Sequence, residues 1–308
     1  MTKHIAVLMG GWVAERPVSL NSALGCVKAL ESVGYRATPL DVTPNIVADL
    51  QALKPDVAFN ALHGPFGEDG GMQGILEMLK IPYTHSGVLA SALAMRKDRA
   101  KTVAAAAGVF VAKGITVSRF EVAKRHVMAP PYVAKPVANG SSFGVFIVKE
   151  GRSHPPQELL AADWPMGDDM LVETFVPGRE LTCAVMGEKN GTKALGVIEI
   201  VANTGDFYDY DAKYAPGGST HVLPAKIKPN IYLKVQQQSV MAHDALGCRG
   251  VSRSDFRYDD ETDTLIWMEV NTQPGMTETS LVPELAAHAG LTFGELVQWM
   301  VEDASLDR

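Results

Sequence analysis

Cysteine is scarce in this 308-residue chain, and the three cysteines form no recognisable motif. Cys26, Cys183 and Cys248 are odd in number, far apart and in no Cys-x-x-Cys pair. A disulfide framework and a zinc site both need cysteines at regular spacings, so the sequence indicates neither. We therefore expect a protein of a reducing compartment, the cytoplasm.

Long apolar runs are also missing. No stretch reaches 18 consecutive apolar residues, the length that a membrane-spanning helix needs. The amino-terminal segment has five apolar residues before Gly10, too few for the apolar region of a secretion signal. We expect no membrane partner.

A surplus of positive charge is absent as well. Lys and Arg total 28 against 35 Asp and Glu, which gives a net charge of -7 and a pI near 5.6. Nucleic-acid-binding domains usually carry a basic surface, so nucleic acid is not an expected partner. A local basic pocket for a small anion such as a phosphate remains compatible with this balance.

The first part of the chain has a regular rhythm. With 46% apolar and 20% charged residues, the chain is long enough for two or three globular domains. Apolar runs at 4–10, 37–42 and 56–62 alternate with helical patterns at 18–35 and 47–55. This alternation predicts βαβ units around a parallel sheet, with ligands at the carboxyl ends of its strands.

Beyond about residue 95 the pattern changes to a mixture of strands and helices, which favours an α+β module. Thr292 is expected to cap the last helix, because a threonine hydroxyl can accept a hydrogen bond from the first helical turn. The predicted strands are 130–137, 144–151, 170–178, 180–187, 194–201, 250–259 and 264–271, and the predicted helices are 95–108, 156–163, 231–247 and 292–303.

Polar side chains interrupt the last predicted strand, where Glu269 and Asn271 lie two residues apart. Side chains alternate along a strand, so both should point to one face, with Trp267 beside them. Arg253 and Asp255 have the same spacing in the preceding strand, and the two strands are predicted to form a hairpin. Asp255, Glu269 and Asn271 would then form an oxygen-rich cluster suited to Mg²⁺. The simpler alternatives are an edge strand with one wetted face and a surface ladder of opposite charges.

A glycine-rich turn follows Lys135 and contains Gly140, Ser141, Ser142 and Gly144. Glycine lets the backbone approach a ligand, several backbone N–H groups can point at one anion, and the lysine adds positive charge. The turn joins two predicted strands, so it is not the strand-to-helix loop of G-x-x-x-x-G-K-[ST] proteins. It predicts a phosphate-binding hairpin; the alternative is a flexible hairpin with an incidental lysine.

Six segments together resemble the D-alanine:D-alanine ligases of the ATP-grasp superfamily, in that family's order and over nearly the whole chain. They are GGWVAERPVSLNS (10–22), ALHGPFGEDGGMQG (61–74), YTHSGVLASALAMRKD (83–98), KPVANGSSFGV (135–145), YDYDAKY (208–214) and MEVNTQPGMTETSLVPE (268–284). The resemblance implies an α/β and α+β architecture, an ATP-grasp fold preceded by a Rossmann-like parallel-sheet domain. The implied domains are an amino-terminal substrate-binding domain at 1–95, a central ATP-grasp subdomain at 96–179 and a carboxyl-terminal ATP-grasp domain at 180–308.

The resemblance also implies a reaction. ATP phosphorylates the carboxylate of one D-alanine to an acyl phosphate, and the amine of a second D-alanine attacks it and expels phosphate. The product, D-alanyl-D-alanine, is a precursor of bacterial peptidoglycan, so the expected role is cell-wall synthesis. The implied cofactors are ATP and two Mg²⁺ ions, with Mn²⁺ as a substitute, and the implied assembly is a cytoplasmic homodimer.

The family's functional residues carry over to matching positions of this chain. Those implied for catalysis are Glu15, Ser141, Tyr214, Arg253 and Gly275, and those implied for the substrates are His63, Ser280 and Leu281. Those implied for the nucleotide are Lys97, Lys135, Ser142, Glu173, Phe175, Val176, Glu180 and Lys213, and those implied for the metal are Asp255, Glu269 and Asn271. Without the resemblance, Glu173 and Glu180 would be interpreted as solvated surface charges and His63 as a structural histidine.

Some positions depart from the family's pattern. Trp12 and Val13 stand where small polar residues are usual, and Gln273 stands where serine is frequent. None of the three removes an implied functional group, so their expected effect is on affinity. The polar stretch at 205–220 is longer than an ordinary structureless connection, which favours a lid over bound nucleotide. Tyr214 favours dipeptide over depsipeptide formation, as the resemblance implies.

Three other functions remain open at this point. Another ATP-grasp ligase could use a different amino-acid or hydroxy-acid pair, because the shared motifs report ATP activation better than pocket shape. A nucleotide-binding regulator without catalysis is disfavoured because the sequence retains Arg253, Asp255, Glu269 and Asn271. A Rossmann dehydrogenase is disfavoured because no G-x-G-x-x-G follows the first strand.

Overall fold

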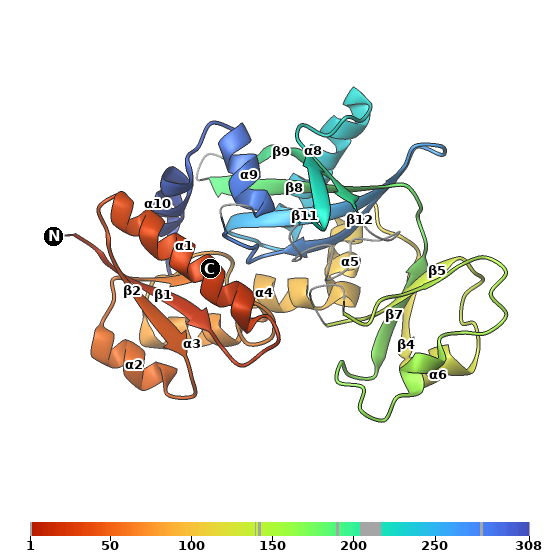
Figure 1. The fold of residues 1–308 in the computed structure, drawn as a ribbon, viewed down its shortest axis with the longest axis horizontal. Helices are drawn as coiled ribbons and strands as arrows, with labels where there is room; N and C mark the ends of the chain where they lie inside the picture. Colours follow the sequence, from red (N-terminus) through yellow and green to blue (C-terminus); the bar gives the residue numbers. More distant parts are fainter. Residues whose placement is uncertain are drawn as a thin grey trace.

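The computed structural model describes residues 2–138, 140, 143–188, 191–203, 217–277 and 280–307. Within these ranges the strands form an amino-terminal sheet, a central sheet and a four-stranded sheet, which follow one another across the molecule (Figure 1). The predicted site residues Ser141, Ser142, Lys213 and Tyr214 lie outside the described residues, as does most of the predicted lid.

The amino-terminal sheet is parallel, with strand order β2-β1-β3, as the alternating sequence pattern predicts. Its elements are β1 (His4–Gly10), α1 (Arg16–Ser32), β2 (Arg36–Val42), α2 (Ile46–Leu53), β3 (Val57–Asn60) and α3 (Gly71–Leu79). Apolar clusters cover both faces of the sheet, one formed with α1 and the other with α2 and α3. Burial on two faces explains why β1 is apolar from Ile5 to Leu8 without a polar interruption.

Two helices connect this sheet to the rest of the molecule, α4 (Val88–Met95) and α5 (Lys97–Ala106). The helix predicted at 95–108 is shorter than expected, because Arg96 is extended (φ -92, ψ 93) and separates α5 from α4. After α5 the chain turns at Gly108, whose φ of 91 favours glycine. Helix α4 was not predicted from the sequence.

The four-stranded sheet is antiparallel, with strand order β4-β7-β5-β6. Its elements are β4 (Gly114–Ser118), α6 (Arg119–Lys124), β5 (Tyr132–Pro136), β6 (Phe146–Val148), η1 (Gln157–Leu160) and β7 (Asp169–Thr174). The α-helix predicted at 156–163 is wrong, since only the 3-10 turn η1 forms there. The Arg119 guanidinium donates to the carbonyls of Leu159 and Ala161, which a continuing helix would use for its own hydrogen bonds.

The central sheet is antiparallel, with strand order β10-β9-β8-β11-β12. Its elements are β8 (Arg179–Glu188), β9 (Gly191–Ala202), β10 (Ser219–Val222), α8 (Pro229–Ala245), β11 (Gly250–Asp259), β12 (Thr264–Asn271), α9 (Leu281–His288) and α10 (Phe293–Asp303). Thr292 forms the predicted cap of α10, in a capping box with Glu295. The polar stretch predicted to end at residue 220 ends earlier, because Ser219 already lies in β10. Helix α9 was not predicted from the sequence.

One hydrophobic core is shared by the amino-terminal and central sheets. It contains Phe59 from β3, Ile198 from β9 and Val297 from α10. In Figure 1 α10 lies beside α1, and the chain beyond α10 returns to the amino-terminal sheet, where Ser305 pairs with Tyr83. The two sheets are therefore packed together although they come from opposite ends of the chain. The division into domains at 1–95, 96–179 and 180–308 remains a prediction. Of the helices in the described ranges, none combines the length and the apolar character required to cross a membrane.

A β-bulge in the edge strand β12 changes which side chains share a face. Asp255 lies opposite Glu269 and Phe256 lies opposite Trp267, so Met268 is the extra residue of β12. As a result Trp267 points into a core and is fully buried, whereas Met268 and Glu269 both line a pocket. The prediction that Trp267 shares a face with Glu269 is therefore wrong, because strict alternation fails at a bulge.

A glycine at the entrance to β8 gives a testable prediction about stability. Gly178 has a φ of 88, and a side chain there would overlap the carbonyl oxygen of Tyr258. Gly151 has a φ of 75 but nothing within 4 Å of the corresponding position, so it is a matched control. Gly151→Ala should destabilise the fold by about 1 kcal/mol through backbone strain alone, and Gly178→Ala by about 3 kcal/mol. Thermal unfolding of both variants checks this, and equal midpoints would contradict it.

Candidate active site

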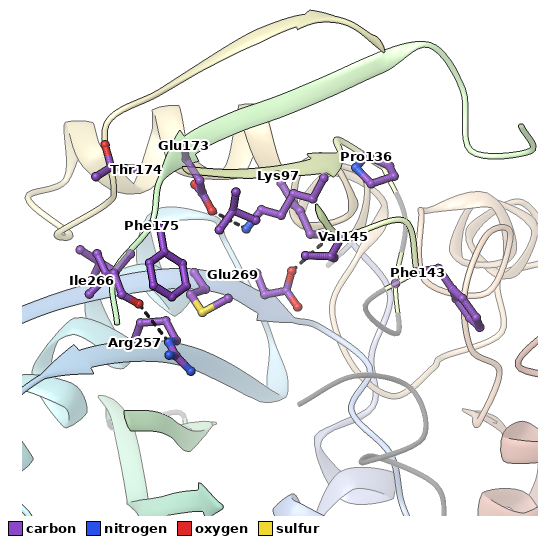
Figure 2. Close-up of a pocket in the computed structure, with 15 residues that line it drawn as sticks. Lys97, Pro136, Phe143, Val145, Glu173, Thr174, Phe175, Arg257, Ile266 and Glu269 are labelled. Atoms are coloured by element: carbon purple, nitrogen blue, oxygen red, sulfur yellow. Dashed lines mark hydrogen bonds and ion pairs between the residues drawn. The ribbon is translucent and has the colours of Figure 1, made fainter. Parts of the chain in front are cut away.

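A pocket lies between the four-stranded sheet and the central sheet (Figure 2). In the view of Figure 2, Glu173 of β7 points down into it and Glu269 of β12 points up from the opposite wall. The segment that connects β7 to β8 also borders the pocket. Six of the residues predicted from the sequence line it: Lys97, Lys135, Glu173, Phe175, Val176 and Glu269.

Glu173 lies between two buried lysines. Its Oε1 is 2.5 Å from Lys135 Nζ and its Oε2 is 2.7 Å from Lys101 Nζ, and all three side chains are less than a tenth exposed. Burial raises the pKa of the Glu173 carboxyl, but the charges of Lys135 and Lys101 outweigh burial and lower the pKa to about 2. The interpretation of Glu173 as a solvated surface charge is therefore wrong. Although Oε2 contacts Lys101, it has no hydrogen bond of good geometry among the described residues, so it can still accept one.

The predicted hairpin of β11 and β12 is confirmed, and it surrounds Asp255 with donors. Arg253 binds both carboxylate oxygens of Asp255, with Nε to Oδ1 at 2.9 Å and Nη2 to Oδ2 at 2.7 Å. The hydroxyl of Thr182 donates to Oδ1 at 2.7 Å, and the amide of Asn271 donates to Oδ2 at 3.1 Å. Both carboxylate oxygens of Asp255 therefore accept hydrogen bonds, which fix the orientation of this side chain in the hairpin.

Glu269 lies directly opposite Asp255 in the hairpin, and Lys97 Nζ is 3.1 Å from its Oε2. Two carboxylates and the Asn271 amide on one face are oxygen donors that suit a hard cation. Among the described residues there is no cluster of three or more histidine, cysteine, aspartate or glutamate side chains. A cation held here would need further oxygens from Asn271, water or a bound phosphate. The donor set fits Mg²⁺ shared with a nucleotide better than a closed protein site.

One side of the pocket is apolar and is closed by an arginine. Phe175 and Val176 border it, and Arg257 Nε donates to the Val176 carbonyl at 3.3 Å. Arg257 Nη1 also lies 3.5 Å from Glu180 Oε2, which brings the predicted ribose contact to this end of the pocket. Burial lowers the pKa of Arg257, and the charge of Glu180 opposes that shift.

A second group of predicted residues lies at the carboxyl end of the amino-terminal sheet. His63 follows β3, its Nδ1 is 3.0 Å from Glu68 Oε1, and its Nε2 is 3.5 Å from Ser22 Oγ. Glu15 is buried at the start of α1, and a side chain on Gly140 would begin 3.3 Å from Glu15 Oε1. The predicted Glu15 and the glycine-rich turn of the four-stranded sheet are therefore neighbours, although they belong to different sheets.

The segment after β12 connects the two groups. Gln273, at a position that departs from the family's pattern, donates from its amide to the backbone carbonyl of Leu62 beside His63. The first side-chain carbon of any residue replacing Gly275 would lie 3.0 Å from Ser280 Oγ, so glycine keeps this turn open. Leu281 is buried in the core that the sheets share, where it begins α9.

The structure also shows contacts around the site that were not predicted from the sequence. Lys101 and Arg257 hold pocket carboxylates, Thr182 holds Asp255, and Glu68 and Gln273 hold the region of His63. Lys101 had a signal in the sequence, because it lies one helical turn after Lys97 and so shares its face, and Gln273 stood out as a departure from the family's pattern. The others are placed by strands and turns that are distant in sequence.

Solved structures with the same fold first define the class of protein. A D-alanine--D-alanine ligase from Bacillus anthracis, solved in complex with ATP, has a TM-score of 0.81 and 27% identity, with 98% of this chain and 97% of that chain covered. VanG, a D-Ala:D-Ser ligase from Enterococcus faecalis, has a TM-score of 0.80 and 31% identity, with 98% and 99% covered. The predicted fold class, an ATP-grasp fold with a parallel amino-terminal sheet, is confirmed.

Sequence relatives then define the family. The models described as "D-ala D-ala ligase C-terminus" and "D-ala D-ala ligase N-terminus" match residues 106–302 and 45–86. Proteins named D-alanine--D-alanine ligase from Methylobacterium radiotolerans and Methylocella silvestris are 66% and 65% identical, with all of both chains covered. The chain belongs to the D-alanine–D-alanine ligase family, as its motifs predict.

The buried Glu173 gives a prediction about pH dependence. Because its pKa is lowered from 4.5 to about 2 in the folded protein, its stabilising contribution is present above about pH 4.5 and is lost as the pH falls towards 2. The total is about 3 kcal/mol, of which about 2 kcal/mol should be lost between about pH 6 and about pH 3. Glu173→Gln should be less stable than the unmodified protein at neutral pH and should lack this part of the pH dependence. The free energy of unfolding in urea is measured for both proteins at both pH values. The prediction would be contradicted if both proteins lost the same amount of stability between the two pH values.

Proposed function

We propose that the protein joins two D-alanine molecules into D-alanyl-D-alanine, with ATP converted to ADP and phosphate. The observation that carries the proposal is the pocket between two sheets, which Lys97 and Lys135 line. Lys97 contacts Glu269, which lies directly opposite Asp255 in the hairpin of β11 and β12. Positive groups, hard oxygen ligands and an apolar slot are the parts that phosphoryl transfer from a nucleotide requires. A relative that is 66% identical over its full length and named for this activity supports the same reaction.

The nucleotide is proposed to lie across the pocket. Phe175 and Val176 would border the adenine, and Glu173 would accept a hydrogen bond from its amino group, because Oε2 retains acceptor capacity. Lys97 and Lys135 line the same pocket and would bind the phosphates. Ser142 and Lys213, and Glu180 at the ribose, complete the nucleotide contacts in this proposal.

Mg²⁺ is proposed to bind at Asp255, Glu269 and Asn271, where the donor set fits. When bound, it would neutralise charge on the phosphates and act as a Lewis acid. Arg253 pairs with Asp255 and Lys97 pairs with Glu269, so these two cations already hold the proposed ligands in place. Positioning of the phosphate acceptor is then the main task left to the protein.

The amino acids are proposed to bind between the pocket and the amino-terminal sheet. Glu15, Ser141 and Tyr214 would hold the first D-alanine, and His63, Ser280 and Leu281 would surround the carboxylates and the amine of the substrates. Arg253 and the backbone N–H of Gly275 would stabilise the oxyanion when the amine attacks the acyl phosphate. The hydrogen bond of Gln273 to the residue before His63 supports this arrangement, since it joins the two halves of the site. A cytoplasmic homodimer with a role in peptidoglycan synthesis completes the proposal.

An assay of single amino acids tests the function. Purified protein is incubated with ATP, Mg²⁺ and one amino acid at a time, in the D and the L form, and phosphate release and product mass are measured. D-Alanine should give both phosphate and a dipeptide. In a second series, D-serine or a hydroxy acid is added beside D-alanine. A product that forms only in this series, a dipeptide with D-serine or a depsipeptide with the hydroxy acid, would indicate a different ligase. ATP binding without phosphate release for any amino acid would indicate a regulator.

Removal of one proposed metal ligand gives a further prediction. Glu269→Ala should lower turnover by at least about 1000-fold, because positioned charge at a transferring phosphoryl group contributes several kcal/mol. Glu261→Ala is the matched control, since Glu261 is exposed in the turn of the same hairpin. Phosphate release is measured for both variants after circular dichroism has shown that they are folded. Near-normal turnover of Glu269→Ala would remove Glu269 from the site.

A further inference from the structure

Two lysines on one face of α5 reach opposite walls of the pocket. Lys97 contacts Glu269 on β12 of the central sheet, at 3.1 Å. Lys101, one helical turn later, contacts Glu173 on β7 of the four-stranded sheet, at 2.7 Å. The first lysine lines the pocket and is part of the proposed phosphate site, whereas the second is not among the lining residues of that pocket.

Lys101 lies behind the pocket and not in it. Its side chain is 7% exposed, and its Nζ is within 3.4 Å of the Trp267 carbonyl oxygen as well as in contact with Glu173. Among the described residues that line the pocket, Glu173 and Lys135 are present and Lys101 is not. A nucleotide in the pocket would therefore meet Glu173 and Lys135 first, and Lys101 would act only through them.

Glu173, Lys101 and Lys135 form a buried group in which positive charges outnumber negative ones. Two ammonium groups share the one carboxylate of Glu173, one on each oxygen. Burial lowers the pKa of Lys101, and the charge of Glu173 opposes that shift. If Lys135 were the only partner of Glu173, its movement to a phosphate would leave a buried carboxylate without a counter-ion, which is strongly destabilising. With Lys101 in place, the carboxylate keeps one partner while the other binds phosphate.

We propose that Lys101 is the permanent counter-ion of Glu173, a positioning residue that frees Lys135 to bind the nucleotide and keeps Glu173 aimed at the base. This inference rests on the proposed function, because it takes Lys135 as a phosphate ligand. It adds to that function a residue that touches neither the nucleotide nor the amino acids.

A double-mutant cycle on ATP binding tests the proposal. The dissociation constant of ATP is measured by calorimetry with Mg²⁺ and without amino acid, so that no turnover occurs. Lys101→Met keeps the length of the side chain and removes its charge, and should weaken ATP binding about tenfold or more. In a Glu173→Gln background the same substitution should change binding less than about twofold, because no carboxylate is left to neutralise. Arg99→Met is the matched control, because Arg99 lies on the same helix and is exposed. The dissociation constant of ATP should be the same for this variant as for the wild type.

The outcomes separate the counter-ion role from a structural role and from failure of the proposed function. The inference would be overturned if Lys101→Met weakened ATP binding equally in both backgrounds. It would also be overturned if Lys101→Met did not weaken ATP binding in the unmodified background. In either case ATP binding by the wild type would still support the proposed function. A wild-type protein that binds no ATP would overturn the proposed function and this inference together.

A crystal structure of the wild-type protein with ATP and Mg²⁺ gives a second test that needs no variant. Lys135 Nζ should leave Glu173 for a phosphate oxygen, while Lys101 Nζ stays in ion-pair contact with Glu173. A complex in which Lys135 remains on Glu173, or in which Lys101 turns to the nucleotide, would overturn the inference even if Lys101→Met does not fold.

Discussion

A carboxylate removed from water is stable only when cations or hydrogen-bond donors face it, and the pocket between the two sheets is built on this constraint. Glu173 lies between two buried lysines, Glu269 pairs with Lys97, and Asp255 is held by Arg253. In the first two cases the cations come from elements other than the strand that bears the carboxylate. The ion pairs therefore connect α5, the four-stranded sheet and the central sheet. The same contacts supply the charges that a triphosphate and a divalent cation would meet.

The site is also divided between parts of the chain that are distant in sequence. The parallel amino-terminal sheet brings His63 and Glu15 to its carboxyl edge, as ligand-binding parallel sheets commonly do. The antiparallel hairpin of β11 and β12 brings Asp255 opposite Glu269. The shared core of α1, α9 and α10 and the hydrogen bond from Gln273 hold these two halves against each other. This arrangement suits a reaction that joins an activated carboxylate to an amine bound nearby.

Much of the fold was predictable because local patterns agree with the final structure. The alternating apolar runs gave the parallel sheet, and Thr292 marked the start of the last helix. The failures have local causes. The helix expected at 156–163 does not form because Arg119 takes the carbonyls that it would need. Trp267 was assigned to the wrong face because one bulge residue, Met268, interrupts the alternation of β12.

The sequence by itself determined the family, the order of strands and helices in outline, and the pairing of two acidic strands, since motifs and periodicity are local properties of the chain. Only the tertiary structure decided that Glu173 is buried between Lys135 and Lys101, that Arg257 meets Glu180, and that the glycine-rich turn lies near the start of α1. The physical reason is that burial and ion pairing depend on how sheets pack together. No spacing along the chain encodes which side chains will face each other across that contact.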